Sequence, residues 1–412
     1  MRATPRCSLL IAALPVGNAL QPYMSQNTCS WSGFPLAFEQ CALGNIIGSL
    51  VDIRGLGGHH DDNSVDDERI NVWRTSPDCF DEYCVYTNNA FLGEGISLIT
   101  TASNYIRVAQ IQIREAVLRS SYDKARIVEI PRKGKGLVAT RAIRKGEAIM
   151  AARPALLVHR DAFSELPLED MYYLMDVAVN NLPKPRKESY LAQAGTMGGH
   201  KITDILFTNS FQVAVGGYDG FHYGNFPEVS LLNHDCRPNL AFFIDQKLTH
   251  YTHAVRNIEP GEELTISYID ALQVRLVRQE RTRNTLGFSC ACSHCTLSKN
   301  DVDASDGRLL AMSRIEKELA DFSSQASSPE MIEEYVNLYR TEGLEHNLAG
   351  AYTLAALNYN LFGKGDMAKK YAQLSVEAGL LESGPDAADV REMKILADYP
   401  ESHWSWNMKP YR

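Results

Sequence analysis

The stretch SLLNHDCRPN, residues 230–239, carries Cys236, and the stretch GFSCACSHC, residues 287–295, carries Cys290, Cys292 and Cys295. These four are the only cysteines downstream of residue 84. Thiolates are soft ligands that hold zinc at about 2.3 Å, and a closed structural zinc site takes four ligands. The spacing therefore predicts a structural zinc at Cys236, Cys290, Cys292 and Cys295, joining two distant stretches of chain.

The alternative for this cluster is a set of reduced thiols in a small core. A Cys-x-Cys-x-x-Cys spacing disfavours it, because such spacing is typical of metal sites. A site closed by four thiolates leaves no open position on the metal, so the zinc is expected to be structural and to take no part in a reaction.

Composition limits the class of protein. At 412 residues the chain has room for two or three domains, and 45% hydrophobic with 22% charged residues is ordinary for a globular protein. The formal charge of −9, without a long basic run, disfavours direct binding to nucleic acid and suits a basic peptide or protein tail.

The first nineteen residues have the layout of a secretory signal peptide: a basic start, a short apolar run and small residues before a cut after Ala19. Pro15 and the brevity of the apolar run leave a buried or unstructured N-terminus as the alternative. If the signal is real, Cys29, Cys41, Cys79 and Cys84 are expected to form two disulfides. No other stretch approaches the ~18 apolar residues that a membrane span needs.

Residues 20–118 are predicted to be irregular, because clusters of Gly, Asn and Asp such as RGLGGHHDDNSVDDE favour loops. From Ala125 onward, short apolar runs between turn residues predict strands. The expected strands are 126–131, 136–140, 147–158, 239–245, 248–258 and 263–269.

Two helices are expected among these strands. Residues 164–182 have helical spacing with Ser164 as N-cap, and residues 271–287 form a helix that ends at Gly287. From residue 304 the pattern is helical, and residues 349–379 pair two helices across a Gly-Lys-Gly-Asp turn. This pair resembles a tetratricopeptide hairpin, and a generic helical bundle is an equally good interpretation.

Five motifs in order carry a family resemblance: KGKGLVAT, TNSFQV, SLLNHDCRPN, GEELTISYI and GFSCACSHC. Together they resemble a SET-domain lysine methyltransferase with its cysteine-rich post-SET segment, and in particular the SET and MYND-domain group. The resemblance covers about residues 126–296, with a looser likeness to about residue 395. It implies an α+β fold: a β-rich SET domain (125–286), a zinc-stapled post-SET segment (287–298) and a tetratricopeptide-like helical domain (304–397).

The resemblance implies S-adenosylmethionine as cofactor. Gly134 and Gly136 lack a Cβ, so the backbone can approach a ligand closely, although a plain glycine hairpin is the alternative. Asn233 and His234 match positions that hold the adenosyl part, and Phe288 matches an aromatic that packs on adenine. Asp235 stands where the family usually has serine. The full set of implied cofactor residues is Lys133, Gly134, Lys135, Gly136, Asn209, Asn233, His234, Tyr268 and Phe288.

The resemblance also implies a lysine channel shaped by Phe211 and bordered by Tyr268, the implied catalytic residue. A free lysine has a pKa near 10.4, so supplying the neutral amine at pH 7 costs about 4 kcal/mol. A desolvated channel beside a cationic sulfonium lowers that pKa. Tyr268 would align the amine, with the gain coming from positioning.

The sequence departs from these relatives in one respect. Residues 85–235 contain no cysteine, so the MYND zinc finger that they insert within the SET domain is absent.

The activity implied is S-adenosylmethionine-dependent methylation of a protein lysine, in a histone tail or another protein. The alternative is a non-catalytic SET-fold scaffold that binds a protein partner through its C-terminal helices. The resemblance implies an intracellular protein, in the nucleus or cytoplasm, whereas the N-terminus suggests the secretory route. The degree of methylation and the oligomeric state do not follow from the sequence.

Overall fold

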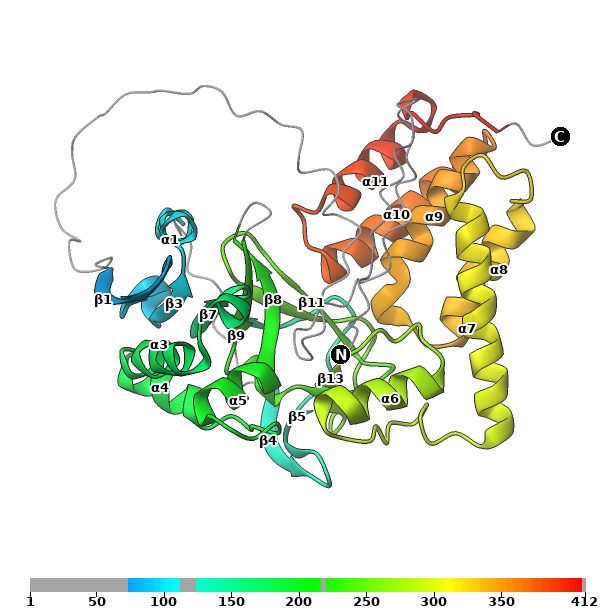
Figure 1. Ribbon diagram of the computed structural model, residues 1–412. Coiled ribbons are helices and arrows are strands. Elements are labelled where there is room, and N and C mark those ends of the chain that lie inside the picture. The colour runs from blue at the N-terminus through cyan, green and yellow to red at the C-terminus, as the bar shows by residue number, and fades with distance from the viewer. Residues whose placement is uncertain (1–72, 112–123, 216–219, 410–412) are drawn as a thin grey trace, which may run out of the picture.

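The computed structural model describes residues 73–111, 124–215 and 220–409 (Figure 1). The signal-like residues 1–19, Cys29 and Cys41 lie outside the described residues, so the secretory route and a disulfide at those two cysteines stay predictions. In the described part of the chain, no helix is both long and apolar enough to cross a membrane.

A six-stranded sheet begins in the N-terminal region. The strands β1 (Arg74–Phe80), β2 (Tyr83–Asn88) and β3 (Ile96–Thr100) are antiparallel neighbours, followed by helix α1 (Ala102–Ala109). The expectation of irregular structure is therefore wrong for residues 74–109. The clusters that favoured loops lie upstream, whereas β2 and β3 are rich in aromatic and β-branched residues, which suit a strand.

The same sheet continues with three strands from farther along the chain. β3 pairs in parallel with β7 (Leu156–His159), β7 pairs with β9 (Phe221–Asn225), and β9 pairs with β8 (Ser210–Ala214). All five residues of β3 and all four of β7 are buried, as expected for inner strands covered on both faces.

Two smaller sheets complete the β structure. One has the order β10-β13-β5-β4, with β4 and β5 forming a hairpin, and the other has the order β11-β12-β6. Their bounds are β4 (Ala125–Ile130), β5 (Gly134–Ala139), β6 (Ala148–Ala152), β10 (Asn233–His234), β11 (Leu240–Ile244), β12 (His250–Ala254) and β13 (Glu263–Ile266).

Two local expectations are wrong. The single strand expected over 147–158 is divided into β6 and β7, which belong to different sheets, with Pro154 between them; proline has no N–H to continue a ladder. Ser164 is not the N-cap of the long helix. It lies inside the short α2 (Ala162–Glu165), and Pro167 is the N-cap of α3 (Leu168–Asn180).

Helices α3, α4 (Lys184–Leu191) and α5 (Lys201–Asn209) pack on the six-stranded sheet. Apolar side chains of α3 at helical spacing, Met171, Leu174, Met175 and Ala178, are buried in that core. Helix α6 (Arg275–Leu286) ends at Gly287, whose φ of 74° is the left-handed conformation that glycine adopts without a Cβ clash.

The C-terminal part of the chain is helical and lies to one side of the β structure (Figure 1). Helix α9 is buried along almost its whole length and forms an antiparallel pair with α10, as the sequence predicted. The helices are α7 (Lys299–Ala320), α8 (Pro329–Thr341), α9 (Leu348–Leu361), α10 (Gly365–Glu382) and α11 (Ala388–Asp398), with short 3-10 turns η4 (Glu345–Asn347) and η5 (Pro400–Ser402). Two further 3-10 turns lie upstream, η2 (Phe91–Gly93) and η3 (Val229–Leu231).

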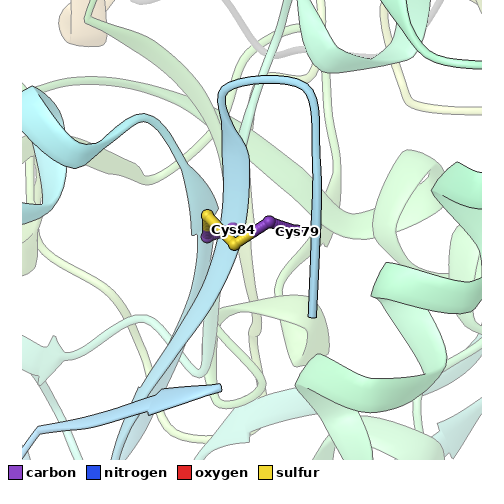
Figure 2. Close-up of a disulfide and its surroundings, with 2 residues drawn as sticks. All are labelled: Cys79 and Cys84. Atoms are coloured by element: carbon purple, nitrogen blue, oxygen red, sulfur yellow. A yellow bond between two sulfur atoms is a disulfide. The ribbon is translucent and has the colours of Figure 1, made fainter. Parts of the chain in front are cut away.

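A disulfide joins Cys79 and Cys84 across the β1–β2 hairpin, with an S–S distance of 2.05 Å (Figure 2). The two residues are directly opposed in the strand register. Two of the four cysteines expected to be oxidised are thus paired with each other.

Candidate functional site

The four predicted zinc ligands come together. The sulfur atoms of Cys236, Cys290, Cys292 and Cys295 all lie within 4.8 Å of one another, and all four residues are buried. Cys236 Sγ is 3.9 Å from Cys290 Sγ and 3.7 Å from Cys295 Sγ. A regular tetrahedron of sulfurs around zinc has edges of about 3.8 Å. The donor set and its spacing fit zinc, so this cluster could bind the ion.

Helix α6 holds the cysteine-rich segment through its side chains. Gln279 Nε2 donates to the Cys290 carbonyl at 2.7 Å, and Arg275 Nε donates to the Cys295 carbonyl at 2.8 Å. Arg278, only 1% exposed, lies close enough to interact with the thiolates of Cys236 and Cys295. Its positive charge would offset part of the net charge of −2 that four thiolates and one Zn²⁺ carry.

The glycine strand β5 lies against Asn233. A Cβ on Gly136 would be 2.7 Å from Asn233 Nδ2, so any larger residue there would force the Asn233 amide to move. Asn233 Nδ2 donates to the Lys135 carbonyl at 3.2 Å and to Glu263 Oε1 at 2.9 Å. Lys133 Nζ forms an ion pair with Glu263 Oε2 at 2.7 Å. Four of the predicted cofactor residues therefore adjoin one another.

Glu263 was missed in the sequence analysis. It links Lys133 to Asn233, and it lies on β13, which runs between β5 and β10. The sequence motif around Tyr268 could have indicated it, because Glu263 is part of the GEEL stretch that precedes Tyr268.

The ring of His234 is fixed at both nitrogens. Its Nδ1 accepts from the Tyr268 backbone N–H at 3.0 Å, and its Nε2 is 3.4 Å from Cys236 Sγ. Burial lowers the pKa of His234 to about 4, so the ring is neutral at pH 7. With Nδ1 accepting, the proton is on Nε2, which can donate to the sulfur of a metal ligand. His234 thus joins the cysteine cluster to the Tyr268 segment.

Tyr268 lies just after β13, beside His234 and Phe288. The ring centroids of Tyr268 and His234 are 5.4 Å apart, and those of Tyr268 and Phe288 are 6.4 Å apart. The Tyr268 hydroxyl donates to the Leu232 carbonyl at 2.5 Å. Burial, reinforced by the Glu263 carboxylate, raises the pKa of the Tyr268 phenol above its usual value, so the hydroxyl stays protonated.

Asn209 and Phe211 lie at the junction of α5 and β8. Asn209 Nδ2 donates to the carbonyls of Ala194 at 2.7 Å and Ile205 at 2.8 Å. Phe211 is 3% exposed and belongs to the core against which Tyr268 also packs. Its ring contacts include those with Phe226, Phe242 and His250.

Asp235, the departure from the family's serine, has a local structural role. Its Oδ1 accepts from the Arg237 backbone N–H at 2.8 Å, which is the hydrogen bond of an Asx turn. A serine hydroxyl makes the same kind of turn, so the substitution preserves the local backbone. Burial, together with the nearby Cys292 thiolate, raises the pKa of Asp235 to about 6.

Comparison with known proteins identifies the central part of the chain. A family model described as "SET domain" matches residues 134–269. The chain is 30% identical over 182 residues to "Histone-lysine N-methyltransferase set5" of Schizosaccharomyces pombe, covering 43% of this chain and 52% of the relative. It is 42% identical over 82 residues to "N-lysine methyltransferase SMYD2" of Gallus gallus, covering 19% of each.

A third relative is "Histone-lysine N-methyltransferase SMYD3" of Homo sapiens, 35% identical over 102 residues, covering 25% of this chain and 24% of the relative. The chain thus spans about half, or less, of the length of these curated relatives. The matched residues 134–269 include Gly134, Asn209, His234 and Tyr268. This part of the chain is a SET domain, and the protein resembles the SET and MYND-domain lysine methyltransferases.

Proposed function

We propose that this protein is an S-adenosylmethionine-dependent protein-lysine N-methyltransferase whose post-SET segment is held by a structural zinc. The observation that carries the proposal is the convergence of Tyr268, His234 and Phe288 at the edge of a sheet that also bears the glycine strand. Its relatives are named as protein-lysine methyltransferases, which supports this activity at the level of the family.

The residues present fit the cofactor. A Cβ on Gly134 would have nothing within 4 Å, so the start of β5 is open to a ligand, and Gly136 leaves room for the Asn233 amide. The side-chain oxygen of Asn209 would accept from an ammonium group. Phe288 offers a half-buried aromatic face suited to a purine ring. Lys133, Gly134, Lys135, Asn233 and His234 complete the proposed set. Bound S-adenosylmethionine would supply an electrophilic methyl group on a cationic sulfur.

Tyr268 would position the substrate lysine. Its hydroxyl hydrogen is donated to the Leu232 carbonyl, and a phenolic oxygen can also accept from an amine N–H. A neutral phenol held in this way can orient the amine without adding charge, and orientation of the reacting atoms is a large source of rate acceleration. Phe211 would shape the wall of the channel.

The four thiolates would hold one zinc ion at a closed site. Its role would be to fix the segment that carries Phe288, because Cys290 follows Phe288 by two residues and Cys236 follows His234 by two. The substrate would be a lysine in a basic protein segment, a histone tail or another, which suits the charge of −9.

The proposed function is tested by measuring both cofactor binding and methyl transfer to lysine. Calorimetry should show S-adenosylmethionine binding to the wild-type protein, and a peptide array with labelled cofactor should show methylation of lysine. Tyr268→Phe removes one hydroxyl and keeps the ring, so binding should persist while the rate falls by roughly 10- to 1000-fold.

Tyr173→Phe is the matched control, since that tyrosine lies on the surface of α3 and bonds Asp78. A Tyr268→Phe variant that methylates at the wild-type rate would remove Tyr268 from the mechanism. Failure of the wild-type protein to bind the cofactor would instead favour the non-catalytic scaffold.

A further inference from the structure

Glu342, just after α8, is a carboxylate with no exposed surface. Its Oε2 accepts from Arg237 Nη2 and from the Ser305 hydroxyl, both at 2.7 Å, and its Oε1 accepts from Arg308 Nε at 2.7 Å. A buried charge is costly unless it is paired and hydrogen-bonded. Arg308 and Ser305 meet part of that condition from within the helical domain, and Arg237, 105 residues away in sequence, adds a second positive charge.

The other hydrogen bonds of Arg237 go both to the SET domain and to the helical domain. Its Nη1 donates to the carbonyl of Cys236 at 2.8 Å and to that of Ala271 at 3.2 Å, and its Nε donates to the Glu342 carbonyl. Cys236 is a predicted zinc ligand, and Ala271 is three residues beyond Tyr268. One guanidinium group therefore joins the zinc segment, the Tyr268 segment and the helical domain.

Two further contacts reinforce this link. His294, between Cys292 and Cys295, has its Nε2 3.8 Å from Glu342 Oε2. Ala271 is buried in the core of the helical domain, the same cluster that contains Leu344 and Leu348 on either side of η4. The helical domain thus contacts both stretches that supply zinc ligands.

We propose that Arg237 and Glu342 form a clasp by which the C-terminal helical domain holds the zinc segment and the Tyr268 segment in fixed relation. Both are positioning residues. The part of this inference that concerns zinc retention is independent of the proposed methyltransferase activity, and the part that concerns Tyr268 rests on it. Outer contacts of this kind commonly change metal affinity by about 10- to 100-fold.

The decisive measurement is the rate at which the zinc-loaded full-length protein loses zinc to a chromogenic chelator. Glu342→Gln keeps the size of the side chain and removes its charge, so zinc loss should accelerate by about 10- to 100-fold. The matched control is Glu333→Gln within α8, because Glu333 accepts hydrogen bonds from Tyr359 and Tyr371, which both belong to the helical domain. Release within twofold of wild type in Glu342→Gln would overturn the clasp.

A double-variant comparison tests whether the two residues act together. Arg237→Met and Glu342→Gln should each accelerate zinc loss, and the double variant should be no faster than the faster single variant. Accelerations that multiply would show independent effects and overturn the clasp. If either charge variant cannot be purified folded, Ser305→Ala removes one neutral hydrogen bond to Glu342 and should still accelerate release severalfold; an unchanged rate would overturn the proposal.

Turnover provides the second readout. In the Glu342→Gln variant kept saturated with zinc, kcat should fall by about tenfold and the KM for cofactor should change little, since the clasp positions Tyr268. Faster zinc loss with an unchanged kcat would overturn the part that concerns Tyr268. A wild-type protein without methylation activity would refute the proposed function, and the zinc measurement would still decide the clasp.

Discussion

Gly136 on β5 is the residue that most clearly requires a small side chain, because the Asn233 amide of β10 lies against it. Its missing side chain leaves room for the Asn233 amide, which in turn holds Glu263 and, through it, Lys133. The glycine is needed for space and not for an unusual φ, in contrast to Gly134, whose φ is +74°.

Gly136→Ala should weaken cofactor binding by about tenfold or more, because the added Cβ would lie 2.7 Å from both Asn233 Nδ2 and Ile130 Cγ1 and would push against both. Calorimetry with S-adenosylmethionine measures the effect. Gly307→Ala, in α7 with nothing within 4 Å of the new Cβ, is the control and should leave binding unchanged. Unchanged affinity in Gly136→Ala would place the cofactor elsewhere.

His222 is a buried neutral histidine away from the zinc cluster. Its Nδ1 donates to the Gly220 carbonyl at 2.8 Å, and its Nε2 is 2.7 Å from Thr100 Oγ1. Burial lowers its pKa from 6.5 to about 3. The unfolded chain therefore binds a proton first as the pH falls, and folding stability is lost between about pH 6.5 and pH 3.

Replacing His222 by Gln should reduce the acid sensitivity of the protein. In the wild type this histidine lowers the free energy of unfolding by about 1–2 kcal/mol between pH 7 and pH 5, and the variant lacks that contribution. Urea unfolding at both pH values gives the comparison. An equal loss in the two proteins would show that His222 is not neutral in the folded state.

At the scale of elements, helix α6 and the segment after it act as a unit. Gly287 ends the helix in a left-handed conformation, the Phe288 N–H bonds the Thr282 carbonyl, and side chains of α6 hold the backbone of Cys290 and Cys295. The position of Phe288 therefore depends on both the helix end and the cysteine cluster.

Cys236→Ser should release zinc and loosen this segment, because the thiolate of Cys236 is the only one of the four supplied from outside it. Metal analysis of the purified variant should show a loss of bound zinc, and hydrogen exchange should rise across residues 287–298. Zinc retained at full occupancy would exclude Cys236 as the fourth ligand. Ser293→Ala, in the same segment but not a ligand, is the control.

At the scale of the whole molecule, the helical domain packs on the three-stranded sheet as well as on the cysteine cluster. Helix α10 contacts β11 and β12, and Gly384, two residues after α10 ends, lies against the ring of Phe243. A Cβ at Gly384 would be 2.6 Å from Phe243 Cε2.

Gly384→Ala should lower the free energy of unfolding by about 2–4 kcal/mol. Alanine adopts the φ of +86° poorly, and its Cβ would clash with the ring of Phe243. Gly261→Ala separates the two causes: its φ is +90° and nothing lies within 4 Å of its Cβ, so it should cost only about 1 kcal/mol. Urea unfolding measures both. An equal decrease in unfolding free energy in the two variants would mean that the Phe243 ring moves aside without destabilising the protein.

Much of the candidate site followed from sequence because its determinants are short motifs. Three cysteines within six residues indicate a metal site by themselves, whereas the Gly-x-Gly turn and the Asn-His pair take their predicted roles from the family resemblance. The structure brings Cys236 to the other three thiols and Tyr268 to His234. Gly287 likewise predicted the end of α6, because the left-handed conformation is a property of a single residue.

The tertiary structure alone decided what depends on distant partners. The pairing of β3 with the distant β7 joined the N-terminal strands to the rest of the six-stranded sheet, and residues 147–158 divided between two sheets around Pro154. The bond between Arg237 and Glu342 has no local signal, since a charged residue near the surface and one in a core look alike in sequence. Pairing and burial are chosen by packing across the whole chain, and the local pattern of residues does not contain that information.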